Sequence, residues 1–400
     1  GKTFVAAALI AALGLRTLYV VLRDNLRVQA IDDMQSVLDC RIEPWTAAGA
    51  VGAGVVGTGA VGSPGPAPGP ADVAVIIVNS ATTLTAEQMR DYSFVIYDEV
   101  HAFASPGRRA ILRSTMTWVN LGMSATTDER ADALDAVYHK ELALGGEVRA
   151  ADLPGFNPCD VLFWIDVDVV SYYGPPEHTE TLIHPSTGAV FTPWMQKQLI
   201  ADRWRTRVIA EHLAALYNEV DASGQPLHGI YVFAEEREHL EVIFADLSKM
   251  FERNGWLLAA PEIGRYVGGA KRNDIRRIVA ECRVFLTTYG YSSAGVSVGK
   301  MSAIILATPR KAGITQIIGR ICRRNGDPQV RRRIIDIVDA CTPFRKQASV
   351  REAAYMLRDR WKIDPITGKP TKERVGYVTV RASRVHWTRV RVDDDAAGDS

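Results

Sequence analysis

Cysteine is scarce in this 400-residue sequence, and its spacing argues against two classes of protein. The five cysteines are widely scattered, and none forms a Cys-x-x-Cys pair. Disulfide-dependent secreted domains carry an even, dense set of cysteines, and structural zinc sites carry closely spaced pairs. The sequence therefore predicts neither a disulfide framework nor a zinc cluster, and it favours a reducing compartment.

Long hydrophobic runs are also missing. No apolar stretch approaches the ~18 residues that a membrane-spanning helix needs. Residues 4–15 are apolar but short, and without a preceding basic region or a cleavage site they predict a buried helix rather than a signal peptide. We therefore expect a soluble intracellular protein with no membrane partner.

Neither sign of charge is in excess, since the formal net charge is +1. No overall electrostatic field advertises a nucleic-acid partner, although basic groups gathered in one cleft would serve the same purpose. The hydrophobic share of 47% supports sizeable buried cores. The length suffices for two domains of ordinary size and a tail.

Residues 1–162 alternate between two kinds of pattern. Nearly continuous apolar runs at 18–22, 73–78 and 94–97 are typical of parallel strands buried on both faces, and helical patterns lie at 4–13 and 25–38. This alternation predicts a doubly wound α/β domain. Residues 46–71 consist almost wholly of Gly, Ala, Val and Pro without charge, so we expect a flexible surface loop there.

A second alternating unit is predicted at 196–350. Between the two, residues 163–195 are interpreted as an inter-domain connection, with a short strand inside 161–170. Residues 351–400 are expected to form a helix followed by a basic tail. The excess of arginine and lysine in that tail suits either a phosphate-binding arm or a solvated terminus.

The first three residues, Gly1, Lys2 and Thr3, have the form of the end of a phosphate-binding loop ahead of an apolar helix. Such a loop places a lysine on the β- and γ-phosphate oxygens of ATP and a hydroxyl on Mg²⁺. The usual upstream glycines do not precede Gly1. We therefore expect the natural start to lie upstream, and this chain alone to be weakly active.

Asp98, Glu99 and His101 directly follow the apolar run at 94–97. Parallel sheets present ligands at the carboxyl ends of their strands. There Asp98 would hold Mg²⁺ through water, Glu99 would polarise the attacking water, and His101 would sense the γ-phosphate. An ordinary acidic loop is the alternative.

The most specific pattern is Gln-x-x-Gly-Arg-x-x-Arg at 316–323. On one helix Gln316, Gly319, Arg320 and Arg323 would share a face. Arg320 and Arg323 would then reach a phosphate as arginine fingers. A basic surface helix is the structural alternative.

In this order and spacing, the motifs resemble those of superfamily 2 DExH-box DNA helicases. The resemblance implies two RecA-like domains in tandem, with ATP and Mg²⁺ in the cleft between them. It also implies that Ser124 and Thr126, in Ser-Ala-Thr, couple the ATP state to domain movement. Thr127 stands where the family usually has proline.

Further roles follow from the same resemblance. Asn79, Ser80 and Thr288 would contact the nucleic-acid backbone, and Gly295 would line the ATP cleft. Ala294 and Ser297 replace the acidic residues usual around that glycine. This variant occurs in helicases of large DNA viruses and tailed phages, so the sequence favours that branch and, for a viral protein, the cytoplasm or nucleus of a host cell.

The expected function is that of an ATP-driven translocase or helicase. DNA is the expected partner, single-stranded or duplex, with RNA left open and no indication of the oligomeric state. Two alternatives stay open at this point. One is an ATPase switch that remodels complexes without unwinding, and the other is an inactive scaffold that binds nucleic acid.

Overall fold

The chain folds into two compact units in a computed structural model, the first ending near residue 156 and the second comprising most of the rest. The structure describes residues 2–45, 72–115, 117–124, 134–142, 146–148, 163–254, 262–292, 298–323, 326–356, 361–363, 370–374 and 377–391. The predicted loop at 46–71 lies outside these ranges. No helix within them is long and apolar enough to cross a bilayer.

The first unit is built on a parallel sheet. Its strands are β1 (Thr17–Val21), β2 (Ile42–Pro44), β3 (Val73–Ile77), β4 (Phe94–Asp98) and β5 (Val119–Met123). They lie in the order β2-β3-β1-β4-β5, and every neighbouring pair is parallel. Because β1 lies between β3 and β4, the runs that the sequence marked as strands occupy the middle of the sheet.

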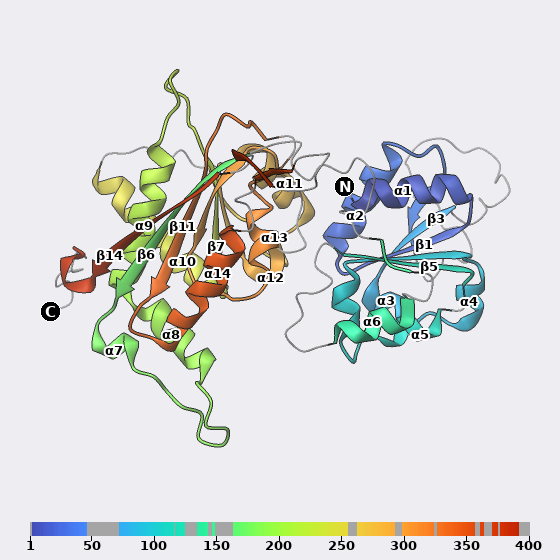
Figure 1. Cartoon of the computed structure of the whole chain (residues 1–400), viewed down its shortest axis with the longest axis horizontal. Helices are drawn as coiled ribbons and strands as arrows, with labels where there is room; N and C mark the ends of the chain where they lie inside the picture. The colour runs from blue at the N-terminus through green and yellow to red at the C-terminus, as the bar shows by residue number, and fades with distance from the viewer. Residues whose placement is uncertain are drawn as a thin grey trace, which may run out of the picture. The chain divides into compact units, whose positions relative to one another are not determined.

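Helices cover both faces of this sheet (Figure 1). They are α1 (Lys2–Leu13), α2 (Asp24–Gln35), α3 (Val78–Ala81), α4 (Ala86–Arg90), α5 (Ala110–Ser114) and α6 (Asp135–Leu142), with a 3-10 helix, η1 (Val100–Ala104). Alternate residues of β1 face opposite layers: Tyr19 and Val21 pack with α1 and α2, and Leu18 and Val20 pack on the other side. Burial on both faces explains why these strands are apolar throughout.

The second unit holds a larger parallel sheet. Its strands are β6 (Trp164–Tyr173), β7 (Gly229–Ala234), β8 (Ile263–Arg265), β9 (Val284–Thr288), β10 (Met301–Leu306), β11 (Arg332–Asp339) and β14 (Tyr377–His386). They lie in the order β14-β6-β11-β10-β7-β9-β8. The short strands β12 (Trp361–Ile363) and β13 (Pro370–Arg374) form a separate antiparallel pair. The predicted fold class, two parallel α/β units in tandem, is thus confirmed.

Helices again form two layers. They are α7 (Pro176–Thr179), α8 (Thr192–Ala201), α9 (Arg203–Asn218), α10 (Arg237–Arg253), α11 (Arg272–Glu281), α12 (Tyr289–Ser292), α13 (Ile314–Ile318) and α14 (Ala348–Met356), with 3-10 helices η4 (Pro343–Gln347) and η5 (Trp387–Arg389). Helices α9 and α10 share one core with the sheet, and α11, α13 and α14 share the other. Figure 1 shows these two layers on either side of β7 and β11.

Two segments differ from the sequence-based expectation. The strand inside the expected connection at 163–195, β6, is hydrogen-bonded between β11 and β14 as an inner strand of the second sheet. The expected tail after 351 contains β14, which extends that sheet. Asp166 and Asp168 give β6 a polar appearance, but arginines from β11 and β14 pair with them.

A buried histidine makes the stability of the second unit depend on pH. His239, in the first turn of α10, is 0% exposed, and neither ring nitrogen has a hydrogen-bond partner among the described residues. Burial lowers the pKa of His239 well below 6.5, and Arg205 acts in the same direction. Below about pH 6.5 the imidazole of His239 is protonated in the unfolded chain but stays neutral in the folded chain. The free energy of unfolding therefore decreases as the pH falls towards the pKa of the folded state.

We expect His239→Leu to remove this contribution. Between pH 6.5 and 5.5 the wild-type chain should lose about 1 kcal/mol more unfolding free energy than the variant. Urea denaturation at the two pH values measures the difference. The exposed His386, replaced by Leu, is the control and should keep the wild-type slope. An unchanged slope in His239→Leu would contradict the assignment.

Candidate nucleotide site

The predicted phosphate-binding and acidic residues of the first unit lie together. Lys2 is the first residue of α1, Asp98 is the last residue of β4, and Glu99 follows it. The Lys2 ammonium contacts the Glu99 carboxylate and lies 3.9 Å from Asp98 Oδ1. A cation thus sits against two carboxylates at the carboxyl edge of a parallel sheet, where such folds bind ligands.

The backbone at Glu99 is strained. With φ 54° and ψ 51°, Glu99 adopts the left-handed conformation, and it is the one described residue other than glycine with positive φ. Its N–H donates to Asp98 Oδ1 over 3.0 Å. Conformations of this kind cost of order 1–3 kcal/mol and gather at functional sites. The turn from β4 into η1 is therefore a candidate functional turn on backbone geometry as well as on sequence.

His101 connects this turn to the end of β5. Its Nδ1 lies 2.9 Å from Ser124 Oγ and 3.4 Å from Glu99 Oε2. One imidazole therefore contacts both the acidic motif and the first residue of Ser-Ala-Thr, which are 23 positions apart in sequence. Thr126, the other predicted coupling residue, lies outside the described residues, as does Gly1.

Tyr19 is a site residue that sequence reasoning missed. Tyr19 is a fully buried residue of β1, and burial raises the pKa of its hydroxyl far above the usual value, with the negative charge of Asp98 acting in the same direction. Burial also raises the pKa of Asp98, while the Lys2 ammonium opposes that shift. In the sequence Tyr19 was indistinguishable from its apolar neighbours, because a buried strand accepts any large side chain.

The oxygen atoms of Thr3 and Asp98 are of the kind that binds Mg²⁺. Thr3 and Asp98 offer a hydroxyl and a carboxylate oxygen, the ligand class that Mg²⁺ prefers. The residues present fit a magnesium–nucleotide site.

Asn79 and Ser80 stand at the same edge of the first sheet. Both belong to α3, which starts directly after β3, and both side chains are exposed. Thr288 ends β9 in the second unit, where its Oγ1 accepts a hydrogen bond of 3.4 Å from Tyr291 N. Gly295 lies outside the described residues. The three described residues thus follow strand ends, as expected for backbone-contacting groups.

The helix expected across 313–323 is shorter than predicted. Helix α13 ends at Ile318, with Gly319 as its C-cap, and the chain continues in turns. Gln316 lies on the helix, and Arg320 and Arg323 lie beyond it. Glycine is a poor helix interior residue, which explains the early end. The prediction that all four motif residues share one helix face was therefore wrong.

The two arginines are nevertheless close in space. Arg320 is buried and Arg323 is half-buried. Burial raises the pKa of Tyr231, on β7, to about 12, and both arginines act in the opposite direction on that phenol. Both guanidinium groups therefore lie near the same strand of the second sheet.

Comparison with known proteins finds one family model and several viral relatives. Residues 1–129 match a family described as "Type III restriction enzyme, res subunit". QP509L of African swine fever virus (strain Badajoz 1971 Vero-adapted), provisionally named an ATP-dependent RNA helicase, is 27% identical over 363 residues, covering 89% of this chain and 66% of that protein. The chain is similar to superfamily 2 helicases. L396 of Acanthamoeba polyphaga mimivirus, also provisionally named an ATP-dependent RNA helicase, is 23% identical over 369 residues. The match covers 91% of this chain and 63% of L396.

The helicase-like chain thus spans about two thirds of the length of these viral relatives. Among solved structures, S. cerevisiae Dbp5 bound to RNA and ADP BeF3 has a TM-score of 0.53 at 12% identity, over 97% of this chain and 83% of Dbp5. The Type ISP restriction-modification enzyme LlaBIII bound to DNA has a TM-score of 0.55 at 13% identity, over 95% of this chain and 29% of the enzyme. At such identities the likeness shows the fold, two RecA-like domains in tandem.

Proposed function

We propose that this helicase-like chain is the motor of an ATP-dependent nucleic-acid translocase. The observation that carries the proposal is the contact of Lys2 with Glu99 beside Asp98, linked through His101 to Ser124. Here a phosphate-binding lysine, two carboxylates and a route to the next strand converge at one sheet edge.

Each residue has a proposed part in hydrolysis. On ATP binding, Lys2 exchanges its carboxylate partners for the β- and γ-phosphate oxygens. Glu99, released from the lysine, then orients and polarises the attacking water. Thr3 and Asp98 would hold Mg²⁺, which would neutralise charge on the phosphates when bound. His101 passes the state of Glu99 to Ser124, and a change there is the proposed signal for domain movement.

The second unit supplies Arg320 and Arg323, with Gln316, to the same cycle. We propose that the arginines stabilise charge on the transferred phosphate, as the likeness to helicases implies. Asn79, Ser80 and Thr288 would hold the nucleic-acid backbone, a mode of contact that reads no base sequence. The sequence favours DNA, and the viral relatives are named for RNA. Backbone contact is compatible with both.

Steady-state ATP hydrolysis by the full-length protein tests the proposal. It should be measured without nucleic acid, with single-stranded DNA and with single-stranded RNA of equal length. Stimulation of ATP hydrolysis by DNA or by RNA supports a motor and identifies the nucleic acid on which it acts. Hydrolysis without stimulation would favour a different ATPase, and stimulation without strand separation would favour a remodelling switch. Nucleic-acid binding with no hydrolysis would overturn the motor and leave a scaffold.

A further inference from the structure

A pocket opens at the amino ends of strands in the second sheet, opposite the carboxyl ends discussed above. Its volume is about 330 Å³. Gly229 and Arg332, which line it, are the first residues of β7 and β11, and Ser302 is the second residue of β10. These are amino ends of parallel strands, whereas Thr288 stands at a carboxyl end. The pocket is therefore separate from the strand ends that carry the predicted motifs.

The pocket contains a buried cation without a carboxylate partner. Arg332 is 1% exposed, and no carboxylate lies within ion-pair distance of it among the described residues. Its Nε donates to Ile321 O over 2.5 Å, and Nη1 donates to Val330 O. Burial lowers the pKa of this guanidinium, which reports the cost of holding the charge there. An anion in the pocket would offset that cost.

The other charged groups of the lining favour an anion. Arg283 donates to the carbonyl oxygens of Tyr217 and His228 and lies 3.7 Å from Glu262. Lys300 is exposed at the rim and donates to a backbone carbonyl. Asp327 is the single carboxylate among the lining residues. Arg283 is thus already paired with Glu262. Arg332 and Lys300 therefore share the single lining carboxylate, Asp327, which partly offsets the cost of burying Arg332.

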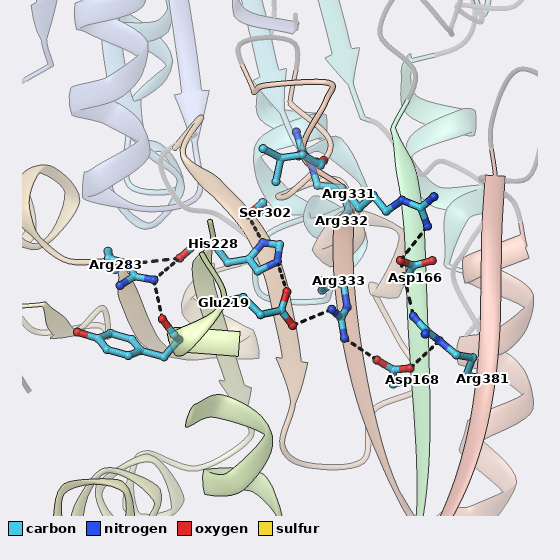
Figure 2. A network of polar contacts seen from close by, with 12 residues as sticks. Asp166, Asp168, Glu219, His228, Arg283, Ser302, Arg331, Arg332, Arg333 and Arg381 are labelled. Atoms are coloured by element: carbon cyan, nitrogen blue, oxygen red, sulfur yellow. Dashed lines mark hydrogen bonds and ion pairs between the residues drawn. The ribbon is translucent and has the colours of Figure 1, made fainter. Parts of the chain in front are cut away.

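The wall beside these cations is held rigidly. His228 is hydrogen-bonded to Ser302 through Nδ1 and to Glu219 through Nε2, and burial lowers the pKa of the imidazole while Glu219 opposes that shift. From Glu219 a chain of ion pairs runs through Arg333 and Asp168 to Arg381 of β14 (Figure 2). Both arginines in this series of ion pairs, Arg333 and Arg381, have carboxylate partners. Arg332 differs from them, because no described carboxylate lies within ion-pair distance of it.

We propose that this pocket binds a phosphate group, either of a small phosphorylated ligand or at the end of a nucleic-acid strand. The volume lies at the lower end of the range for ligand pockets, ~300–1,000 Å³, which suits one or two phosphates. Guanidinium and ammonium groups are the usual phosphate-binding side chains. The binding itself does not depend on the proposed ATPase.

Arg332 would also connect phosphate binding in the pocket to the segment that carries Arg320 and Arg323. Its Nε holds the carbonyl of Ile321, which lies in the chain between Arg320 and Arg323. A phosphate that draws the guanidinium towards the pocket changes that hydrogen bond, and with it the segment that carries both arginines. This consequence rests on the proposed function of those arginines, whereas the change in the segment can be measured without ATP hydrolysis.

Calorimetric titration with pyrophosphate tests the site. All variants carry Lys2→Ala, so that the candidate nucleotide site does not contribute. Lys300 is exposed, so its replacement by Gln should not disturb the fold. Lys300→Gln should weaken pyrophosphate binding about tenfold, because one charge-assisted contact is lost. Asp327→Asn should tighten it by a few-fold, because it removes the one repelling carboxylate. Arg331→Gln, next to Arg332 but outside the lining, is the matched control and should bind normally.

Inorganic phosphate and oligonucleotides with and without a 5′-phosphate distinguish the two sources. Preference for the phosphorylated strand over free pyrophosphate identifies a strand end, and the reverse identifies a small ligand. Hydrogen exchange of residues 316–323 should change on binding, and in Lys300→Gln the same change should need about tenfold more pyrophosphate. No binding at millimolar pyrophosphate, or equal binding by Lys300→Gln and Asp327→Asn, would overturn the proposal. Loss of ATPase alone would leave it standing.

Discussion

Glu99→Gln is expected to reduce nucleic-acid-stimulated ATP hydrolysis by about 10²–10⁴-fold in the full-length protein, the range typical for loss of an acid–base group. The amide keeps the size of the side chain but cannot accept a proton from water. It also releases Lys2, which contacts the carboxylate. Nucleotide affinity should therefore stay the same or rise. Phosphate release and binding of a fluorescent ATP analogue measure the two effects separately.

The matched control is Glu87→Gln. Glu87 lies in α4 of the same unit and is exposed. Its replacement should leave hydrolysis within twofold of wild type, since surface substitutions rarely matter. If Glu99→Gln kept more than a tenth of the wild-type rate, Glu99 would not be the group that activates water, and the proposed role would have to move to another residue.

The second large effect is expected on stability. Arg351→Met should lower the unfolding free energy by about 3–5 kcal/mol. Arg351 is buried; its Nε donates to both Asp336 oxygens at 2.9 Å, and Nη1 donates to Arg310 O. Tyr355 also donates to Asp336. Without the guanidinium, the buried carboxylate loses its countercharge. Urea denaturation compares the variant with wild type.

Arg345→Met is the control for this change, because Arg345 is exposed in the neighbouring η4. It should alter stability by less than about 0.5 kcal/mol. The double variant Arg351→Met, Asp336→Leu should recover part of the loss, since no buried charge is then left unpaired. A double variant less stable than Arg351→Met would show that the carboxylate is held mainly by Tyr355.

The sequence predicted the central strands because burial on both faces makes them apolar. β1, β3 and β4 have this character, and each was expected within a residue or two. β6 and β14 lack it. The aspartates of β6 interrupt its apolar pattern, and β14 is mostly exposed and basic. Their backbones join the sheet by regular parallel pairing, and ion pairs across the strands compensate the charges, a match that a single sequence does not reveal.

The site was predictable where a motif sits next to a strand. Asp98 ends β4 and Glu99 follows it, so the local pattern alone predicted their position at the carboxyl end of a strand. Tyr19 has no such pattern, and its role depends on the approach of Thr3 and Asp98. The pocket around Arg332 is further from prediction still, because its lining comes from separate segments around Gly229, Arg283 and Ser302.

The position of β6 in the second sheet has a consequence for synthesis. Contacts such as Arg333 with Asp168 join residues 165 positions apart. Strands paired over such separations form slowly, because loop-closure entropy opposes the pairing until many contacts exist. On the ribosome β6 emerges long before β11 is made, and its edges stay open to other chains meanwhile. A nascent chain is therefore most prone to misassembly between the emergence of β6 and that of β11.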